Sequence, residues 1–291
     1  MGTLEVGSLL ADRYEIKSLL GRGGMGMVYL VKDWKTSEEL ALKTLLPKYA
    51  HNPQAAKRFA REVTAARQLD HPCVVKIFDA QQYGDILFYT MEYLQGKSLR
   101  DLMRKRRKRG QNMGLGSTVR ILSLLCHALE HAHQFTVHRD ISPENVMVMP
   151  NGDVKLLDFG LAKLTTMDSN LTKVGISLGK MQYSAPEQRA DAKNVDHRAD
   201  IYSLGVMFYE MLSGELPLGG EPLTALVKSL PREADKLVEK TIAHNPEDRY
   251  SSAKDFRIDL LRIYQRGTGE AIEILPVTEE DLADQALDES L

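Results

Sequence analysis

Hydrophobic and polar residues alternate along most of the first ninety positions, a period of two that is typical of β-strands. The pattern predicts strands over residues 14–20, 27–32, 40–45, 74–80 and 86–92. Between the third and fourth strands, apolar side chains recur every three or four positions over residues 55–69, which predicts one amphipathic helix. This part of the chain should therefore form a small sheet accompanied by a helix.

Helical spacing dominates from residue 99 onward. Residues 119–134 and 201–212 are apolar enough to form buried helices. The change from strands to helices predicts an α+β fold with a small β-rich lobe, a larger helical lobe and a cleft between them. The predicted parts are a leader (1–13), a main domain (14–264) with lobes 14–93 and 94–264 joined near residues 92–96, and a tail (265–291).

Composition narrows the class of protein. The 291 residues are 27% charged with a formal net charge of -2, which gives no reason to expect nucleic acid or an anionic membrane as the main partner. No run of about 18 apolar residues and no secretion signal is present, so we expect no membrane segment and a cytoplasmic protein. Cys73 and Cys126 lie far apart among apolar residues, which indicates two buried, reduced thiols.

A glycine-rich segment joins the first two predicted strands. Residues 21–28 read GRGGMGMV, a G-x-G-x-x-G-x-V pattern. Glycines let the backbone approach a ligand closely, so that amide N–H groups can point at phosphate oxygens. The pattern alone is weak, because many glycine turns are simple hairpins. A strand rather than a helix follows it, which argues against a dinucleotide-binding fold.

Lys43 lies in the third predicted strand, fifteen residues after Val28. An unpaired lysine is costly in an apolar strand. Glu62, on the predicted helix of this lobe, is the expected partner, and Lys43 could then hold phosphate oxygens of ATP. Considered alone, Lys43 could equally be a lysine that reaches solvent along the surface.

A second group of polar residues follows a predicted buried helix. Residues 138–145 read HRDISPEN, and residues 158–160 read DFG, starting thirteen positions after Asn145. Asp158 and Asn145 offer hard oxygen ligands suited to Mg²⁺. Asp140 can orient or accept the proton of an attacking hydroxyl. Each short motif occurs by chance, but their order and spacing together make coincidence a poor explanation.

This ordered set resembles the eukaryotic-type (Hanks-type) protein kinase superfamily, and most closely its bacterial serine/threonine branch. The resemblance runs from about residue 14 to residue 264 and includes the Ala-Pro-Glu segment at 185–187. It implies a structural ion pair between Glu187 and Arg249. It also implies that Asp200 braces the catalytic loop through backbone hydrogen bonds.

The resemblance further assigns roles at a nucleotide site. It makes Asp140 the residue that orients the acceptor hydroxyl, and it makes Asn145 and Asp158 the metal ligands. Lys43, supported by Glu62, would position the phosphates. The implied cofactors are ATP and Mg²⁺, with Mn²⁺ as a possible substitute. The residues implied to contact the nucleotide are Leu20, Gly21, Arg22, Gly23, Gly24, Met25, Gly26, Met27, Val28, Lys43, Glu92 and Leu94 (adenine), and Ser98 (ribose).

Two positions depart from the family pattern. The lysine that usually follows the catalytic aspartate by two residues is Ser142 here, and the threonine usual before Ala-Pro-Glu is Lys180. We hypothesise that the two have exchanged roles, so that Lys180 reaches Asp140 and the γ-phosphate while Ser142 supplies the hydroxyl. One cation and one hydroxyl would still lie beside the transferred group. The alternative is a damaged site with Lys180 in solvent.

Regulation is expected in the segment 161–182. In the family, the arginine before the catalytic aspartate, here Arg139, often pairs with a phosphate on this segment, and Lys163 matches a second contact. A phosphate there would add negative charge that could order the segment. We expect autophosphorylation, with Thr172 or Ser177 as the acceptor; an unphosphorylated polar loop is the alternative.

Two charge runs stand out. Residues 104–109 are six consecutive basic residues, and the tail after Arg266 holds eight acids and no lysine or arginine. Such runs are usually solvated or disordered. The basic run could attract acidic substrates or the acidic tail, although a contact with the tail would be weak and salt-sensitive.

The sequence thus predicts a serine/threonine protein kinase that acts on protein hydroxyls and self-associates for autophosphorylation in trans. Tyrosine specificity is disfavoured because residues 142–144 (SPE) lack the Ala and Arg of tyrosine-directed members. One alternative is a nucleotide-binding pseudokinase that acts as an interaction module. Another is a small-molecule kinase, which the presence of both Glu187 and Arg249 disfavours.

Overall fold

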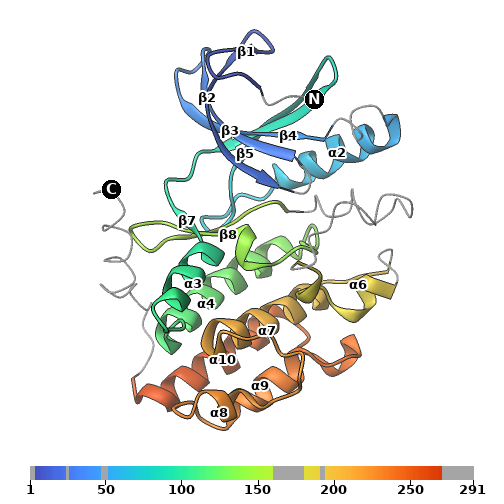
Figure 1. Cartoon of the computed structure of the whole chain (residues 1–291). Helices are drawn as coiled ribbons and strands as arrows, with labels where there is room; N and C mark the ends of the chain where they lie inside the picture. Colours follow the sequence, from blue (N-terminus) through green and yellow to red (C-terminus); the bar gives the residue numbers. More distant parts are fainter. Residues whose placement is uncertain (1–3, 24–25, 47–51, 160–179, 191–193, 271–291) are drawn as a thin grey trace. The chain divides into compact units, whose positions relative to one another are not determined.

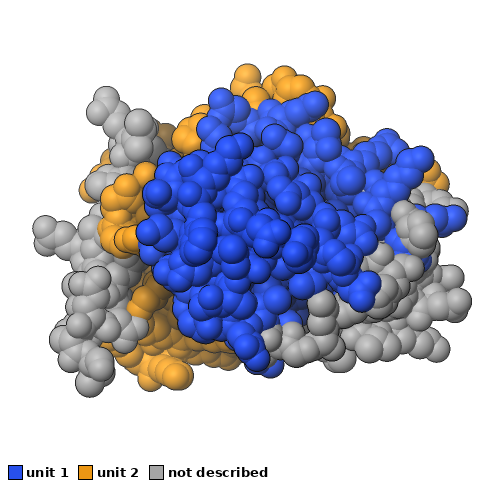
Figure 2. Space-filling view, turned by 90° about the horizontal axis from the view of Figure 1, so that it is seen from above, with its two compact units in different colours: residues 1–70, 75–94, 159–177 blue, residues 71–74, 95–158, 178–291 orange. Residues whose placement is uncertain are grey.

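The computed structural model describes residues 4–23, 26–46, 52–159, 180–190 and 194–270. The chain divides into two compact units, coloured separately in Figure 2. Unit 1 comprises residues 1–70, 75–94 and 159–177; unit 2 comprises residues 71–74, 95–158 and 178–291. The division after Leu94 falls within the predicted join at residues 92–96.

Unit 1 is built on an antiparallel sheet of six strands in the described residues (Figure 1). Its strand order is β1-β2-β3-β4-β6-β5. The strands are β1 (Leu9–Leu10), β2 (Tyr14–Gly23), β3 (Gly26–Asp33), β4 (Glu39–Leu45), β5 (Ile77–Tyr83) and β6 (Ile86–Glu92). Buried side chains from alternate strand positions, such as Tyr14, Ile16, Val31 and Phe88, form one core cluster. The predicted period of two is confirmed at the start of β2 and in β3, whereas β4 and β6 are buried at consecutive positions, on both faces of the sheet.

In the described residues of unit 1 the helix is α2 (Pro53–Ala66). It starts two residues before the predicted position, because proline is well accommodated in a first helical turn. Phe59, Val63 and Ala66 are buried along one face, as the spacing predicted. Leu69 is also buried, but it lies in the turn after the helix, where its N–H donates to Ala66 O.

The chain between α2 and β5 departs from the predicted strand at 74–80. Residues 71–74 belong to unit 2, where Val74 bridges to Leu156 and Cys73 O accepts a hydrogen bond from Leu156 N at 2.9 Å. The apolar residues there are buried by unit 2 rather than by the sheet, so β5 begins only at Ile77. At the N-terminus, β1 lies within the predicted leader and pairs with β2.

Unit 2 combines a small sheet with helices. The strands, in the order β7-β8-β9, are β7 (Lys97–Ser98), β8 (Val146–Val148) and β9 (Val154–Leu156). The helices are α3 (Leu99–Lys108), α4 (Leu115–Ala132), α6 (Pro186–Ala190), α7 (Arg198–Ser213), α8 (Leu223–Leu226), α9 (Glu233–Thr241) and α10 (Ala253–Thr268). The part of unit 2 that the structure describes also has three 3₁₀ turns, η1 (Pro143–Asn145), η2 (Lys180–Gln182) and η3 (Pro246–Asp248). As predicted, α4 and α7 are largely buried.

Other expectations can be compared with unit 2. Helix α10 continues to Thr268, three residues beyond the start of the predicted tail at 265, and ends at Gly269 with a left-handed φ of 76°. Cys73 and Cys126 are both free and buried, as expected. Among the described residues, no helix combines the length and apolar character needed to cross a bilayer.

Candidate active site

The loop between α4 and β8 is held by Asp200, a fully buried carboxylate at the start of α7. Its Oδ2 accepts from the backbone N–H of His138 at 2.8 Å, and its Oδ1 accepts from that of Arg139 at 2.7 Å. These bonds confirm the predicted brace. Arg139 has a φ of 67°, so a residue outside the usual backbone regions is fixed by this carboxylate.

A histidine that the sequence reasoning missed completes this brace. His133, at the C-cap of α4, places Nε2 2.9 Å from Asp200 Oδ2. Burial alone would raise the pKa of Asp200, but the hydrogen bonds from His133 and the backbone outweigh it and lower the pKa. Asp200 therefore stays ionised although no solvent reaches it.

His138 links the catalytic loop to the segment before Asp158. Its Nε2 lies 2.7 Å from Leu157 O, and its Nδ1 lies 3.2 Å from Asp140 N. A carbonyl oxygen only accepts and an amide N–H only donates, so Nε2 carries the proton and Nδ1 accepts. The hydrogen bonds thus select one neutral tautomer of His138.

The carboxylate of Asp140 is positioned by Asn145. Asn145 Nδ2 donates to Asp140 Oδ2 at 2.9 Å and to Asp140 O at 2.6 Å. Asn145 O in turn accepts from Leu157 N at 2.8 Å, next to Asp158, whose φ is 60°. Hydrogen bonds within unit 2 therefore join Asn145 to Asp140 and to Leu157, the residue before Asp158.

The donor set of this cluster fits a divalent cation. Because the amide nitrogen of Asn145 is used on Asp140, its Oδ1 is the atom suited to hold a cation. Asp158 adds a carboxylate that is half-buried. An amide oxygen and a carboxylate are ligands that Mg²⁺ accepts when phosphate and water complete its shell.

Ser142 occupies an unusual position in the same loop. It is only 1% exposed and has extended backbone angles (φ −160°, ψ 160°). Within the described part of the chain its Oγ has no hydrogen-bond partner, which is uncommon for a buried hydroxyl. The side chain of Lys180, its predicted counterpart, lies outside the described residues, so the exchanged roles stay a prediction.

The glycine loop is formed by β2 and β3 of unit 1. A Cβ at Gly26 would lie 1.7 Å from Thr44 O, so only glycine fits at this strand pairing. Gly24 and Met25, at the tip of the loop, lie outside the described residues. Gly21, which is half-buried, and Gly23, which is exposed, belong to β2, which extends further than predicted.

The other predicted nucleotide residues keep their expected elements. Lys43 lies on β4 opposite Val28 of β3 and Tyr89 of β6, and Glu62 lies on α2. Their mutual ion pair stays a prediction. Glu92 ends β6.

The structure gives Ser98 a role that the sequence reasoning did not foresee. Ser98 Oγ caps α3 by accepting from Asp101 N at 3.1 Å. Its predicted ribose contact, like the adenine contacts of Glu92 and Leu94, is untested.

Glu187 and Arg249 form the predicted ion pair. Arg249 Nη1 and Nη2 donate to the two carboxylate oxygens of Glu187, each at 2.7 Å. The predicted phosphate-binding and phosphorylated positions in the segment 161–179, including Lys163, Thr172 and Ser177, lie outside the described residues.

The family model for the protein kinase domain matches residues 14–263. The chain belongs to the protein kinase family. Members of this family use ATP and a divalent metal ion, in agreement with the donor set above. Serine/threonine-protein kinase PknB of Mycolicibacterium smegmatis is 34% identical over 287 residues, covering 91% of this chain and 45% of the relative. A probable serine/threonine-protein kinase of Streptomyces coelicolor is 37% identical over 272 residues, covering 86% and 40%.

The fold of this kinase domain has a solved counterpart. The crystal structure of the Mycobacterium tuberculosis PknI kinase domain superposes with a TM-score of 0.72 at 28% identity, covering 89% of this chain and 98% of that one. The chain spans less than half the length of the curated relatives described above. The predicted α+β protein kinase fold is confirmed.

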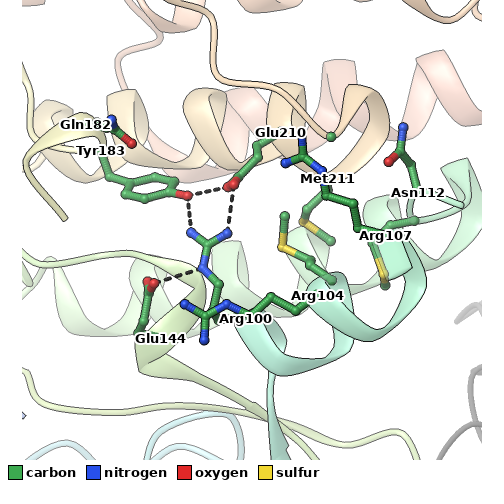
Figure 3. Close-up of a pocket in the computed structure, with 12 residues that line it drawn as sticks. Arg100, Arg104, Arg107, Asn112, Glu144, Gln182, Tyr183, Glu210 and Met211 are labelled. Atoms are coloured by element: carbon green, nitrogen blue, oxygen red, sulfur yellow. Dashed lines mark hydrogen bonds and ion pairs between the residues drawn. The ribbon is translucent and has the colours of Figure 1, made fainter. Parts of the chain in front are cut away.

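One cluster of hydrogen-bonded polar side chains in this kinase domain was not predicted from the sequence. Arg100 of α3 donates to Glu144 Oε1 at 2.8 Å and to Glu210 Oε1 at 2.7 Å (Figure 3). The Tyr183 hydroxyl accepts from Arg100 and donates to Glu210. No local spacing joins the members of this cluster, because they are 44 to 110 positions from Arg100 in sequence.

Proposed function

We propose that this chain is an active serine/threonine protein kinase, which transfers the γ-phosphoryl group of metal-bound ATP to hydroxyls of protein substrates. The observation that carries the proposal is the Asp140 carboxylate, held by Asn145 at 2.9 Å in a loop that Asp200 fixes. Such preorganisation is what a transferase with little covalent chemistry of its own requires.

Each residue has a defined task in this proposal. Asp140 orients the acceptor hydroxyl and takes up its proton as the new P–O bond forms and the bond to the β-phosphate oxygen breaks. Lys43 holds phosphate oxygens, with Glu62 as its partner, and Gly26 permits the close backbone approach of the loop. Asn145 and Asp158 hold the cation, for which we propose Mg²⁺ with Mn²⁺ as a substitute. When bound, the ion neutralises charge on the phosphate oxygens.

The exchange of Ser142 and Lys180 belongs to the proposal. The Ser142 hydroxyl is buried and lacks a partner among the described residues, which supports a role toward a group that arrives with substrate or with Lys180. Lys180 supplies the cation that Ser142 cannot, and the pair together stabilises the spread charge of the transferred group.

The proposal also covers how the kinase is regulated and where in the cell it acts. We propose autophosphorylation in the segment 161–179, in trans between copies of the chain that self-associate, with Arg139 as one phosphate partner. A cytoplasmic location is part of the proposal, because ATP and magnesium are available there.

The test is transfer of labelled phosphate from ATP and Mg²⁺ to the chain itself and to a generic basic protein. Wild type and Asp140→Asn are compared, with nucleotide binding measured separately by the thermal shift that ATP produces. Label on serine and threonine in the wild type, and its loss with nucleotide binding retained in Asp140→Asn, is the expected result. ATP binding without transfer by either protein would overturn the proposal in favour of the pseudokinase.

A further inference from the structure

A pocket of about 270 Å³ lies beside the catalytic loop, entirely within unit 2. Figure 3 shows that α3 lines it with Arg100, Arg104 and Arg107, while the catalytic loop contributes Glu144 and α7 contributes Glu210. The pocket is therefore next to the loop that would bind a polypeptide substrate. The charge of the residues that line the pocket determines which substrate side chain can bind in it.

The two acidic residues of the pocket, Glu144 and Glu210, are already paired with a cation, Arg100. Arg100 binds Glu144 through Nε and Glu210 through Nη1, at 2.8 and 2.7 Å. Burial would lower the pKa of Arg100, but the bonds with Glu210, Tyr183 and Glu144 outweigh it and raise the pKa. The guanidinium thus stays charged, and a basic side chain that entered would have to displace it from paired, partly buried carboxylates.

Two further cations remain at the pocket. Arg104 is exposed, and its one ion pair with a described residue is a long, exposed contact with Asp101 (3.8 Å), of a kind that contributes little. Arg107 is exposed and makes no ion pair with any described residue. Both lie on the face of α3 that lines the pocket, next to Lys105 and Arg106, so the local field is positive.

Resting on the proposed function, we propose that this pocket binds an acidic side chain of the protein substrate, held by Arg104 and Arg107. Arginine is suited to this task because its planar fork matches a carboxylate. Glu144 is four residues from Asp140, and an extended chain of four residues spans at most about 14 Å. Because Glu144 lines the pocket, this edge of the pocket is no further than that from Asp140, so positions within about four of the acceptor residue are the ones to test.

The test begins with binding, so that it stands apart from phosphate transfer. The probes are fluorophore-labelled peptides with alanine at the acceptor position and one Glu, Gln or Lys at each position within four of it. Fluorescence anisotropy with the full chain measures their Kd without ATP. We expect one position at which the Glu peptide binds about fivefold more tightly than the Gln peptide, a difference that increasing salt reduces.

Variants identify the residues responsible. Arg104→Glu/Arg107→Glu should remove the preference for Glu and favour the Lys peptide, and Arg104→Gln/Arg107→Gln should remove it without reversal. Lys108→Glu is the matched control on the same helix, because Lys108 is exposed and does not line the pocket. Arg262→Glu is the second control, since Arg262 is as exposed as Arg104 and likewise has an i,i+3 acidic partner. Both controls should retain the wild-type preference.

The same peptides with serine at the acceptor position connect binding to transfer. The position that favours Glu in binding should also lower KM by about fivefold with little change in kcat, since the acid contacts the pocket and not the reacting atoms. Equal wild-type binding of Glu and Gln peptides, or tighter binding of Lys peptides, would overturn the inference. Loss of the preference in Lys108→Glu to the same extent as in the arginine variants would also overturn it. Glu-selective binding without any transfer would support the pocket and contradict the proposed function.

Discussion

Arg249 donates to both carboxylate oxygens of Glu187 at 2.7 Å from a side chain with no solvent exposure. Its remaining N–H groups donate to the carbonyls of Ala243, His244 and Arg198. One guanidinium therefore ties α6, which begins within the Ala-Pro-Glu segment, to the start of α7 and the loop before η3. It is a stability element of unit 2 rather than part of the chemistry.

Arg249→Ala should lower the free energy of unfolding by about 3–5 kcal/mol, because it leaves the Glu187 carboxylate and three carbonyls without their donor. Arg249→Lys should rescue only part of this, since an ammonium group cannot reproduce the two parallel bonds. Urea denaturation measures both. Arg266→Ala, which removes an exposed ion pair with Glu233, is the control and should cost under about 1 kcal/mol. Equal losses for Arg249→Ala and Arg266→Ala would contradict this view of the pair.

The sequence pattern located most strands because their apolar residues are buried within the sheet to which they belong. The strand at 86–92 was predicted with the bounds that the structure has, since a turn at residues 84–85 precedes it. The strand at 74–80 was misplaced, because Val74 is apolar for a different reason: it packs in unit 2, against the residues around Leu156. Periodicity reports that a residue is buried, but it does not report which part of the fold buries it.

In the candidate active site, too, some residues were predicted from the sequence and others were missed. The ordered motifs gave Asp140, Asn145 and Asp158, and the resemblance gave the Asp200 brace. His133 and the Arg100 cluster were missed, because each depends on residues more than 40 positions away that the fold brings together. A polar residue within a largely apolar helix, such as Glu210 in α7, was the one available signal that a distant cation had to exist.

Asp200 should make stability depend on acid pH. Its pKa is lower in the folded state than the ordinary 3.8, so its contribution is fully present above that value and is lost as pH falls through the folded pKa. Asp200→Asn should therefore destabilise the chain by about 3 kcal/mol near neutral pH, where its amide also presents a donor to backbone N–H groups.

The measurement is the free energy of unfolding of both proteins across a pH series. We expect a constant difference from neutral pH down to about pH 5, and a smaller difference in the acid range as the wild-type carboxylate takes up a proton. A difference that is the same at every pH would show that the charge of Asp200 does not contribute.

Gly26→Ala should distort the glycine loop. The added Cβ would lie 1.7 Å from Thr44 O, so β3 and β4 would have to separate locally. Overpacking of this kind costs about 1–3 kcal/mol, and displacement of the loop should weaken ATP binding as well. Gly21→Ala is the matched control, since nothing lies within 4 Å of a Cβ at that position. Thermal melting with and without ATP reports both effects, and identical melting of the two variants would contradict the steric explanation.

The exchanged roles of Ser142 and Lys180 lead to the most decisive comparison of variants. If Lys180 supplies the cation at the γ-phosphate, Lys180→Ala should lower kcat by about 10²–10³-fold, as expected when one preorganised electrostatic group is removed. Lys228→Ala, at an exposed lysine of unit 2, should leave kcat unchanged. The double variant Ser142→Lys/Lys180→Thr restores the arrangement usual in the family and should recover much of the lost rate, because one cation and one hydroxyl are again present.

The single variant Ser142→Lys distinguishes exchanged roles of Ser142 and Lys180 from a site that tolerates a lysine at both positions. It would place a second cation beside Lys180, so it should reduce activity through repulsion between the two like charges, which the double variant avoids. Steady-state kinetics with ATP and a serine peptide provide kcat for all four variants. Unchanged catalysis in Lys180→Ala, with no recovery in the double variant, would mean that Lys180 plays no part in transfer. Asp140, Asn145 and Asp158 would then carry transfer without this cation, and the buried Ser142 hydroxyl would need a different partner.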